Sequence, residues 1–292
     1  MPINNGDHRR VSQEKIAADL NWLLNSPKLI PLPDSVLEAN FSSPTSKLQI
    51  LASGILERIP EKIRLGRYFE LLCQALIEDS AHWKIVYQNQ QIIDDKKTIG
   101  EFDLILLNQF ENVYEHWEIA IKFYLKIGEY YLGTNIRDRL DLKTKKLLEK
   151  QIRLSEHPVA SKWLQNEGIV IRKRRVLSRG GLFQKATKSN IKELAKSGKY
   201  FWLLESDFIE YFRQDKLRVW RVLDKLEWIS SESQFQVPLY NTETLLSHLR
   251  DQSYGAVYLT GIKPGVDTVR FMLVAERWLE RAYNSLPNKG RQ

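Results

Sequence analysis

The sequence predicts an α/β protein in which helices flank a mixed β-sheet. A helical extension precedes this core, and a smaller α+β unit follows it. The prediction rests on the central part of the chain, where helical and extended patterns follow in the order helix, three strands, helix, strand. A second set of short apolar runs fills the last third. We place the three parts at residues 1–58, 59–180 and 198–292.

Three helices are expected before the sheet. Residues 12–25 have apolar side chains at helical spacing, and Ser12 is a favourable N-cap residue. A proline-rich stretch then favours an extended connection. A second helix is expected from about Thr45. A third should run from Pro60 to about Asp79, because proline suits the first turn of a helix.

Three runs rich in β-branched and aromatic residues predict a three-stranded meander. They are residues 83–91, 100–107 and 114–125. Helices are expected over residues 137–154 and 157–167, followed by a strand over residues 169–177. We interpret the polar, basic residues 180–197 as a linker to the C-terminal unit.

Strands and helices also alternate in the C-terminal unit. The expected strands are residues 200–204, 219–226, 256–260 and 269–274, and the expected helices are residues 207–214, 242–252 and 275–283. Aromatic residues between Tyr200 and Trp228 could stack on nucleic-acid bases, but their spacing favours a hydrophobic core.

Composition limits the class of protein. The single cysteine, Cys73, excludes an intrachain disulfide framework and fits a reducing compartment. The N-terminal residues lack the apolar stretch of a secretory signal, and no apolar run approaches the roughly 20 residues that span a bilayer. We therefore expect a soluble, cytoplasmic protein without a membrane partner. The sequence does not indicate its oligomeric state.

The net charge of +8 is concentrated in one segment. Residues 143–199 contain 16 lysines and arginines against four acidic residues, which leaves about −4 for the rest of the chain. Such a segment attracts polyanions by releasing the counterions condensed on their phosphates. A solvated basic surface without a partner is the equally open alternative.

Acidic residues and a lysine are placed on neighbouring predicted elements. Because side chains alternate along a strand, Glu101 and Asp103 share one face, and Glu118 and Lys122 share a face of the next strand. Glu70 lies on the preceding helix. Carboxylates on adjacent strands repel unless a cation neutralises them, and oxygen ligands suit Mg²⁺ or Mn²⁺. With a lysine added, the set indicates phosphodiester hydrolysis.

This layout resembles the PD-(D/E)XK nuclease superfamily and, more narrowly, the bacterial family called domain of unknown function 1853. The motifs that carry the resemblance are Gly66-Arg67-Tyr68-Phe69-Glu70, Gly100-Glu101-Phe102-Asp103, Glu118-Ile119-Ala120-Ile121-Lys122-Phe123-Tyr124-Leu125 and Asp138-Arg139-Leu140. The resemblance spans most of the chain. It implies a restriction-endonuclease-like fold and metal-dependent cleavage of nucleic acid.

The resemblance also implies roles for individual residues. Asp103 and Glu118 would be metal ligands, with the backbone carbonyl of Ile121 as a possible third, for Mg²⁺ or Mn²⁺. Glu70 would complete the metal site. Glu101 could be a bystander.

The same resemblance makes Lys122 the catalytic lysine and places Gln151 on the next helix, facing the site. The superfamily has its second acid two residues before the lysine, where this chain has Ala120. Glu118 lies about 6–7 Å further back along the strand. Either Glu70 supplies the missing carboxylate, or the site is degenerate and hydrolyses nothing.

Candidate nucleic-acid contacts come from the basic segment and from the helix that bears Glu70. In the run Arg172-Lys173-Arg174-Arg175, alternate residues point to opposite sides of the strand, so at most two can reach one phosphate backbone. Arg172 and Arg174 form one such pair, and Arg67 and Lys143 are further candidates. DNA is favoured over RNA as the partner.

Simpler interpretations remain open for several of these residues. Glu118 and Lys122 could form a solvent-facing ladder of charges, Arg67 and Glu70 could pair with each other, and Gln151 could be an ordinary surface residue. At the level of function, the alternatives are a metal-dependent nuclease, a non-catalytic nucleic-acid-binding or scaffold protein with a degenerate nuclease fold, and a protein whose basic segment meets an acidic protein partner.

Overall fold

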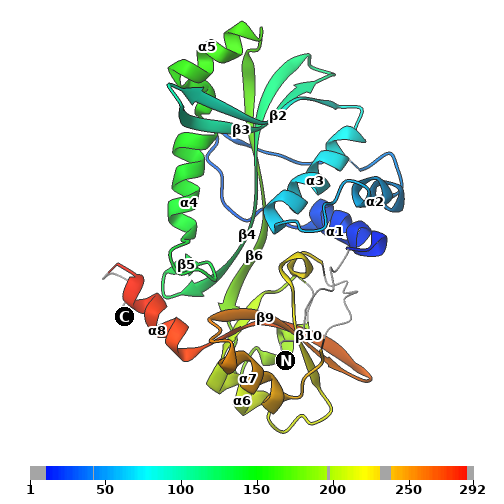
Figure 1. Cartoon of the computed structure of the whole chain (residues 1–292), viewed down its shortest axis with the longest axis vertical. Coiled ribbons are helices and arrows are strands. Elements are labelled where there is room, and N and C mark those ends of the chain that lie inside the picture. The colour runs from blue at the N-terminus through cyan, green and yellow to red at the C-terminus, as the bar shows by residue number, and fades with distance from the viewer. Residues whose placement is uncertain (1–10, 42, 196–197, 231–237, 288–292) are drawn as a thin grey trace. The chain divides into compact units, whose positions relative to one another are not determined.

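A computed structural model of the chain describes residues 11–41, 43–195, 198–230 and 238–287 (Figure 1). It is a mixed α/β structure that divides into two compact units. The first unit comprises the described residues of Met1–Ile121, Thr144–Arg179 and Ile229–Phe235, and the second those of Lys122–Lys143, Gly180–Trp228 and Gln236–Gln292.

The helices of the first unit are close to the predicted ones. They are α1 (Gln13–Asn25), α2 (Leu48–Leu56), α3 (Leu65–Glu78) and α5 (Pro158–Asn166). The Ser12 hydroxyl accepts a hydrogen bond from the Lys15 backbone N–H at 3.3 Å, which confirms the predicted N-cap of α1. The start predicted for α3 at Pro60 is wrong. The helix begins at Leu65, where the buried apolar stripe begins, because a proline permits a helical start but does not impose one.

The predicted meander is confirmed. Its strands are β2 (Trp83–Asp94), β3 (Lys97–Asn108) and β4 (Val113–Ile127), paired antiparallel in that order. The short strand β1 (Leu37–Glu38), which the sequence did not indicate, pairs parallel with β6 (Ile171–Lys185). In the part of the chain that the structure describes, the strand order is β2-β3-β4-β6-β7-β10-β9-β8, with β1 on β6 and β5 on β4.

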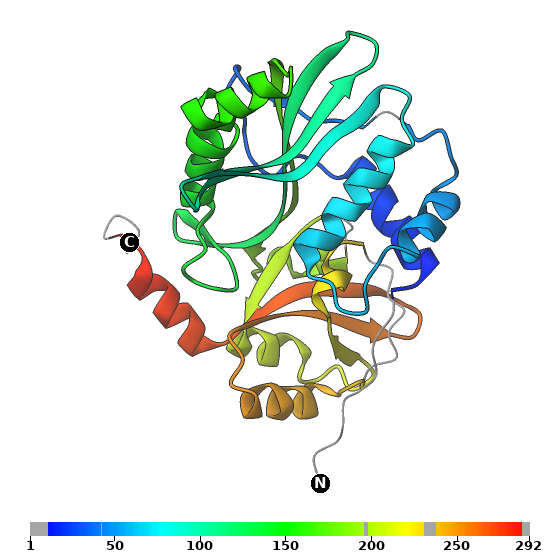
Figure 2. The same cartoon turned by 45° about the horizontal axis from the view of Figure 1, so that its top comes forward.

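Helices lie on both sides of the meander, with α3 on one side and α5 on the other in both views (Figures 1 and 2). An apolar cluster joins α5 to the strands. It contains Ile92, Phe102, Ile105, Leu154, Ala160, Leu164 and Ile169. This packing fixes the part of β3 that carries Asp103.

The second unit holds the remaining strands of this order and further helices. Its further elements are β5 (Tyr130–Leu132), β7 (Phe201–Leu204), α6 (Glu205–Phe212), β8 (Val219–Val222), α7 (Thr242–Asp251), β9 (Ala256–Lys263), β10 (Val266–Val274) and α8 (Glu276–Ser285). Strand β10 pairs parallel with β7 and antiparallel with β9. Figure 2 shows α6 and α7 together on one face of β9 and β10. No helix formed by the described residues is long and apolar enough to cross a bilayer.

Aromatic packing fills the centre of the second unit. Trp220 is fully buried, and the rings of Phe208, Phe212 and Phe271 lie 4.9–5.9 Å from it or from one another. Trp202 and the other buried aromatic side chains of this region also belong to the core. The prediction that these rings form a core is confirmed.

The predicted linker over residues 180–197 is wrong at its start, because β6 continues to Lys185. The helix predicted over residues 137–154 is present over residues 140–151, but it is not a regular α-helix throughout. Helix α4 (Leu140–Lys146) passes directly into a π-helical turn, Leu147–Gln151, which is followed by a short 3₁₀ turn.

Gly180, in β6, has a backbone that only glycine fits. Its φ is +145°, and a Cβ built there would lie 1.6 Å from the carbonyl oxygen of Lys122. Both the dihedral angle and the close approach exclude a side chain.

We expect Gly180→Ala to lower the free energy of unfolding by more than about 2 kcal/mol, measured by chemical denaturation, because the backbone must move to admit a methyl group. The matched control is Gly54→Ala in α2, where no atom lies within 4 Å of the new Cβ. That variant should gain roughly 0.5–1 kcal/mol from helix propensity. Equal effects of the two substitutions would contradict the steric argument.

Candidate functional site: a buried carboxyl pair

Asp103 and Glu118 meet where the ladder between β3 and β4 ends. Leu104 and Trp117 are the last residues paired in this register, and Asp103 and Glu118 come next on their strands. Instead of a backbone carbonyl, the Asp103 side chain accepts the hydrogen bond of the Ile119 N–H, at 2.8 Å. The sheet therefore opens at the two acids, and the Asp103 carboxyl group holds the backbone there.

The two carboxyl groups share a hydrogen bond, which requires one of them to be protonated. Burial raises the pKa of Asp103 to about 8, with a further contribution from the charge of Glu118. Burial likewise raises the pKa of Glu118 to about 8, and the charge of Glu101 adds to it. Among the described residues, no lysine or arginine forms an ion pair with either group. Like charges in a buried place thus favour the protonated forms.

His116 and Gln151 each contact one oxygen of Glu118. The Nε2 atom of His116 lies 3.0 Å from Oε1, and Gln151 Nε2 donates to Oε2 at 3.0 Å. His116 is fully buried against the ring of Phe102. Burial lowers the pKa of His116 to about 4, so the imidazole is neutral at pH 7 and does not compensate the charge of the pair.

The π-helical turn brings two side chains to Glu118. Its characteristic bond joins the Ile152 N–H to the Leu147 carbonyl at 3.0 Å, five residues back. Gln151 is its last residue and Lys146 its N-cap. The charge of Lys146 lowers the pKa of Glu118, against the larger effect of burial. The sequence pointed to Gln151 but not to Lys146, because five residues along an α-helix correspond to a rotation of about 140°.

Glu70 approaches the pair from α3. Its charge contributes to the raised pKa of Asp103. Arg67 forms an ion pair with Glu70 at 2.7 Å, as the simpler interpretation held, and the Asn89 side chain donates to Glu70 at 3.3 Å. Asn89 stands opposite Asp103, between the Gln88–Leu104 and Gln90–Phe102 pairs. Its φ of 51° is a left-handed conformation that asparagine tolerates.

The remaining predicted site residues lie as follows. Ile121 is buried on β4, three residues after Glu118. Lys122 is half-buried and follows it on the same strand, where it begins the segment Lys122–Lys143 of the second unit. Lys143 is exposed on α4.

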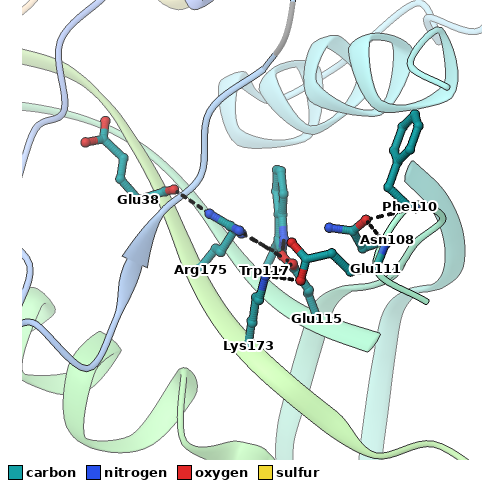
Figure 3. Close-up of polar contacts among 8 residues, drawn as sticks. All are labelled: Glu38, Asn108, Phe110, Glu111, Glu115, Trp117, Lys173 and Arg175. Carbon is teal, nitrogen blue, oxygen red and sulfur yellow. Dashed lines mark hydrogen bonds and ion pairs between the residues drawn. The ribbon is translucent and has the colours of Figure 1, made fainter. Parts of the chain in front are cut away.

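The four basic residues of the run in β6 lie in different environments, and two of them contact a buried carboxylate. Arg175 donates to the fully buried Glu115 at 2.6 Å and to the Glu38 carbonyl at 3.2 Å. Trp117 donates to Glu115 at 3.0 Å, and Lys173 lies 3.9 Å from the same carboxylate (Figure 3). Lys173 and Arg175 are therefore structural residues.

The other two residues of the run differ from each other. Arg174 is half-buried and forms an ion pair with Glu156 at 2.9 Å. Arg172 is exposed and has no carboxylate partner among the described residues. Of this run, Arg172 alone has a charge that is both exposed and uncommitted.

A divalent ion fits this site in a limited way. In the described part of the chain, no three Asp, Glu, His or Cys side chains are arranged to hold a metal ion together. Mg²⁺, however, commonly takes only one or two protein carboxylates and keeps several waters. Asp103 and Glu118 meet that smaller requirement, whereas the Glu70 carboxylate is bound to Arg67 and Asn89.

Fold and site together define a mixed α/β protein with a buried acidic pair at the open end of a β-meander. A family model described as a domain of unknown function (DUF1853) matches residues 18–274, and the chain belongs to that family. The predicted family is thereby confirmed. The searches of curated proteins and of solved structures gave no match.

The raised pKa values predict a pH dependence of stability. Between about pH 4 and pH 8 the folded pair binds more protons than the unfolded chain, so the free energy of unfolding should fall as the pH rises. The slope is about 1.4 kcal/mol per pH unit for each extra proton. We expect Asp103→Asn, which retains an acceptor for Ile119, to reduce this loss and to be more stable than the wild type at pH 8.

Chemical denaturation at pH 5 and pH 8 measures the effect. Comparison with the wild type cancels most of the opposite contribution of His116, whose lowered pKa makes stability rise from about pH 4 to 6.5. The exposed Asp94, substituted by asparagine, is the control and should leave the slope unchanged. A slope equal in the wild type and Asp103→Asn would show that the pair holds no extra proton.

Replacing Arg175 and replacing Arg172 by alanine should have different effects on the free energy of unfolding. Arg175→Ala leaves Glu115 buried beside a single distant lysine, and we expect a loss on the order of 3 kcal/mol in the free energy of unfolding. Arg172→Ala should change it by less than about 0.5 kcal/mol. A small loss for Arg175→Ala, measured by the same denaturation, would mean that Glu115 is satisfied without it.

Proposed function

We propose that this protein is a metal-dependent, nuclease-like enzyme of the PD-(D/E)XK type that hydrolyses phosphodiester bonds in nucleic acid, DNA in particular. The observation that carries the proposal is the carboxyl pair itself. Asp103 and Glu118 are held side by side on neighbouring strands, and no lysine or arginine of the described chain is ion-paired with them. A divalent cation is the partner that such a pair lacks.

Asp103 and Glu118 would hold Mg²⁺ or Mn²⁺, which supplies charge stabilisation on a phosphoryl group and activation of water. His116 and Gln151 fix the orientation of the Glu118 carboxylate by contacting one oxygen each. Asp103 is fixed by the Ile119 N–H. Lys122 is proposed as the lysine that steadies charge on the phosphoryl oxygens, on the strength of the family-like motif alone.

One observation favours a second candidate, a non-catalytic nucleic-acid-binding protein with a degenerate nuclease site. Both oxygens of Glu118 already have protein partners, and Asp103 shares a hydrogen bond with it. The pair can therefore satisfy itself when it holds one proton. Such a protein would bind nucleic acid without cleaving it.

Cleavage of labelled duplex DNA with Mn²⁺ at pH 8 tests the proposal. The wild type should cut, and Asp103→Asn and Lys122→Ala should each reduce the single-turnover rate at least about 100-fold. The first removes a proposed metal ligand, and the second removes the lysine proposed to steady charge on the phosphoryl oxygens. Omission of the metal should abolish cleavage in all proteins.

Thermal unfolding with and without Mn²⁺ supplies a readout that is independent of activity. The wild type should be stabilised by the ion and Asp103→Asn should not, because ligand binding to the native state raises stability. The control is Asp94→Asn, at an exposed residue that pairs with Lys97 at the end of β2, away from the Asp103 position on the ladder. DNA binding without cleavage, together with no stabilisation by Mn²⁺, would favour the degenerate site.

A further inference from the structure

The acidic site repels the ligand that is proposed for it. Four carboxyl groups lie there: the charges of Glu118 and Glu70 raise the pKa of Asp103, and the charge of Glu101 raises the pKa of Glu118. A nucleic-acid backbone carries one negative charge per phosphate. A divalent ion would offset part of this repulsion, and a cation of the protein beside the pair would offset more of it.

Most cations of the first unit that were candidates for this task are committed elsewhere. Arg67 is paired with Glu70 and Arg174 with Glu156, which leaves Arg172 without a carboxylate partner among the described residues. Lys146 differs from them. It is exposed, has no carboxylate within ion-pair distance among the described residues, and acts electrostatically on Glu118.

The backbone explains why Lys146 reaches this position. In a regular α-helix, Lys146 and Gln151 would point about 140° apart. The π-helical turn between them has more residues per turn and so reduces this angle. Gln151 donates to Glu118, and Lys146 acts on the same carboxyl group. The contact of Gln151 thus holds the end of this turn at Glu118, and the wide turn brings Lys146, at its start, closer to the same side.

We propose that Lys146 holds a phosphate of the nucleic acid beside the Asp103–Glu118 pair, as a positioning residue that precedes and supports cleavage. The inference rests on the proposed function and assigns to the Lys146 ammonium the binding of the substrate phosphate. A lysine suits the task, because its ammonium is a compact charge on a flexible stem. Lys145 and Lys150 are also exposed and without a carboxylate partner in the described chain, so the positive surface continues along this helical segment.

Binding of a fluorescein-labelled DNA duplex, followed by anisotropy in EDTA over a range of NaCl concentrations, separates phosphate contact from chemistry. We expect Lys146→Ala to weaken binding roughly fivefold at low salt and to lower the slope of log K against log salt by about one, the loss of one phosphate contact. Lys146→Arg should restore the slope. Lys162→Ala, an exposed lysine of α5 without a carboxylate partner in the described chain, is the matched control and should leave the slope unchanged.

The same variants are then compared in single-turnover cleavage with Mn²⁺. Slower cleavage by Lys146→Ala, rescued by Lys146→Arg and absent in Lys162→Ala, supports the inference. Identical behaviour of Lys146→Ala and Lys162→Ala overturns it, even if the wild type cleaves. A wild type that binds DNA through Lys146 but cleaves nothing refutes the proposed hydrolysis and leaves the phosphate contact standing. A wild type that binds no DNA refutes the contact.

Discussion

Two neighbouring carboxyl groups, Asp103 and Glu118, set the electrostatics of the acidic site in the first unit. Glu118 is fully buried and Asp103 is half-buried at the end of a strand ladder. Burial and the charge of Glu118 raise the pKa of Asp103, and burial raises the pKa of Glu118. The neighbouring groups are neutral dipoles: the Ile119 N–H, the His116 imidazole and the Gln151 amide. They orient the carboxyl groups without cancelling their charge. Ionising both groups is therefore unfavourable unless a cation arrives from outside.

Strand β4 shows that the fold can neutralise a buried acid when the acid is structural. On one side of the strand, Glu115 is fully buried, accepts hydrogen bonds from Trp117 and Arg175, and forms an ion pair with Lys173 (Figure 3). On the other side, Glu118 is equally buried, and its neighbours are another carboxyl group, a neutral histidine and an amide. The two acids are three residues apart and meet opposite electrostatic environments. This contrast separates a structural acid from a candidate functional one.

The sequence predicts the acids of the site better than their surroundings. Alternation along two strands placed Asp103 with Glu101 on one face and Glu118 with Lys122 on another, and the family resemblance selected Asp103 and Glu118. Strand and helix spacing located most elements to within a few residues. The sequence did not predict the π-helical turn, because one extra residue in a helical turn does not change the apolar pattern. The role of Lys146, which precedes this turn, was therefore not predicted either. The left-handed Asn89 was missed as well. The predicted start of α3 was wrong for another reason, because Pro60 was given more weight than the apolar stripe that begins at Leu65.

A purely structural origin for the pair has a physical difficulty. At neutral pH a buried carboxyl group without a cation beside it lowers stability, and a hydrophobic or amide side chain in its place would not. Local violations of this kind are expected chiefly where a site needs them. The surrounding backbone places further polar side chains beside these acids. The π-helical turn brings Gln151 to Glu118, and the left-handed Asn89 on β2 donates to Glu70. A helix and a strand therefore both depart from regular geometry beside the same uncompensated carboxyl groups. A divalent ion would compensate the negative charge of these groups.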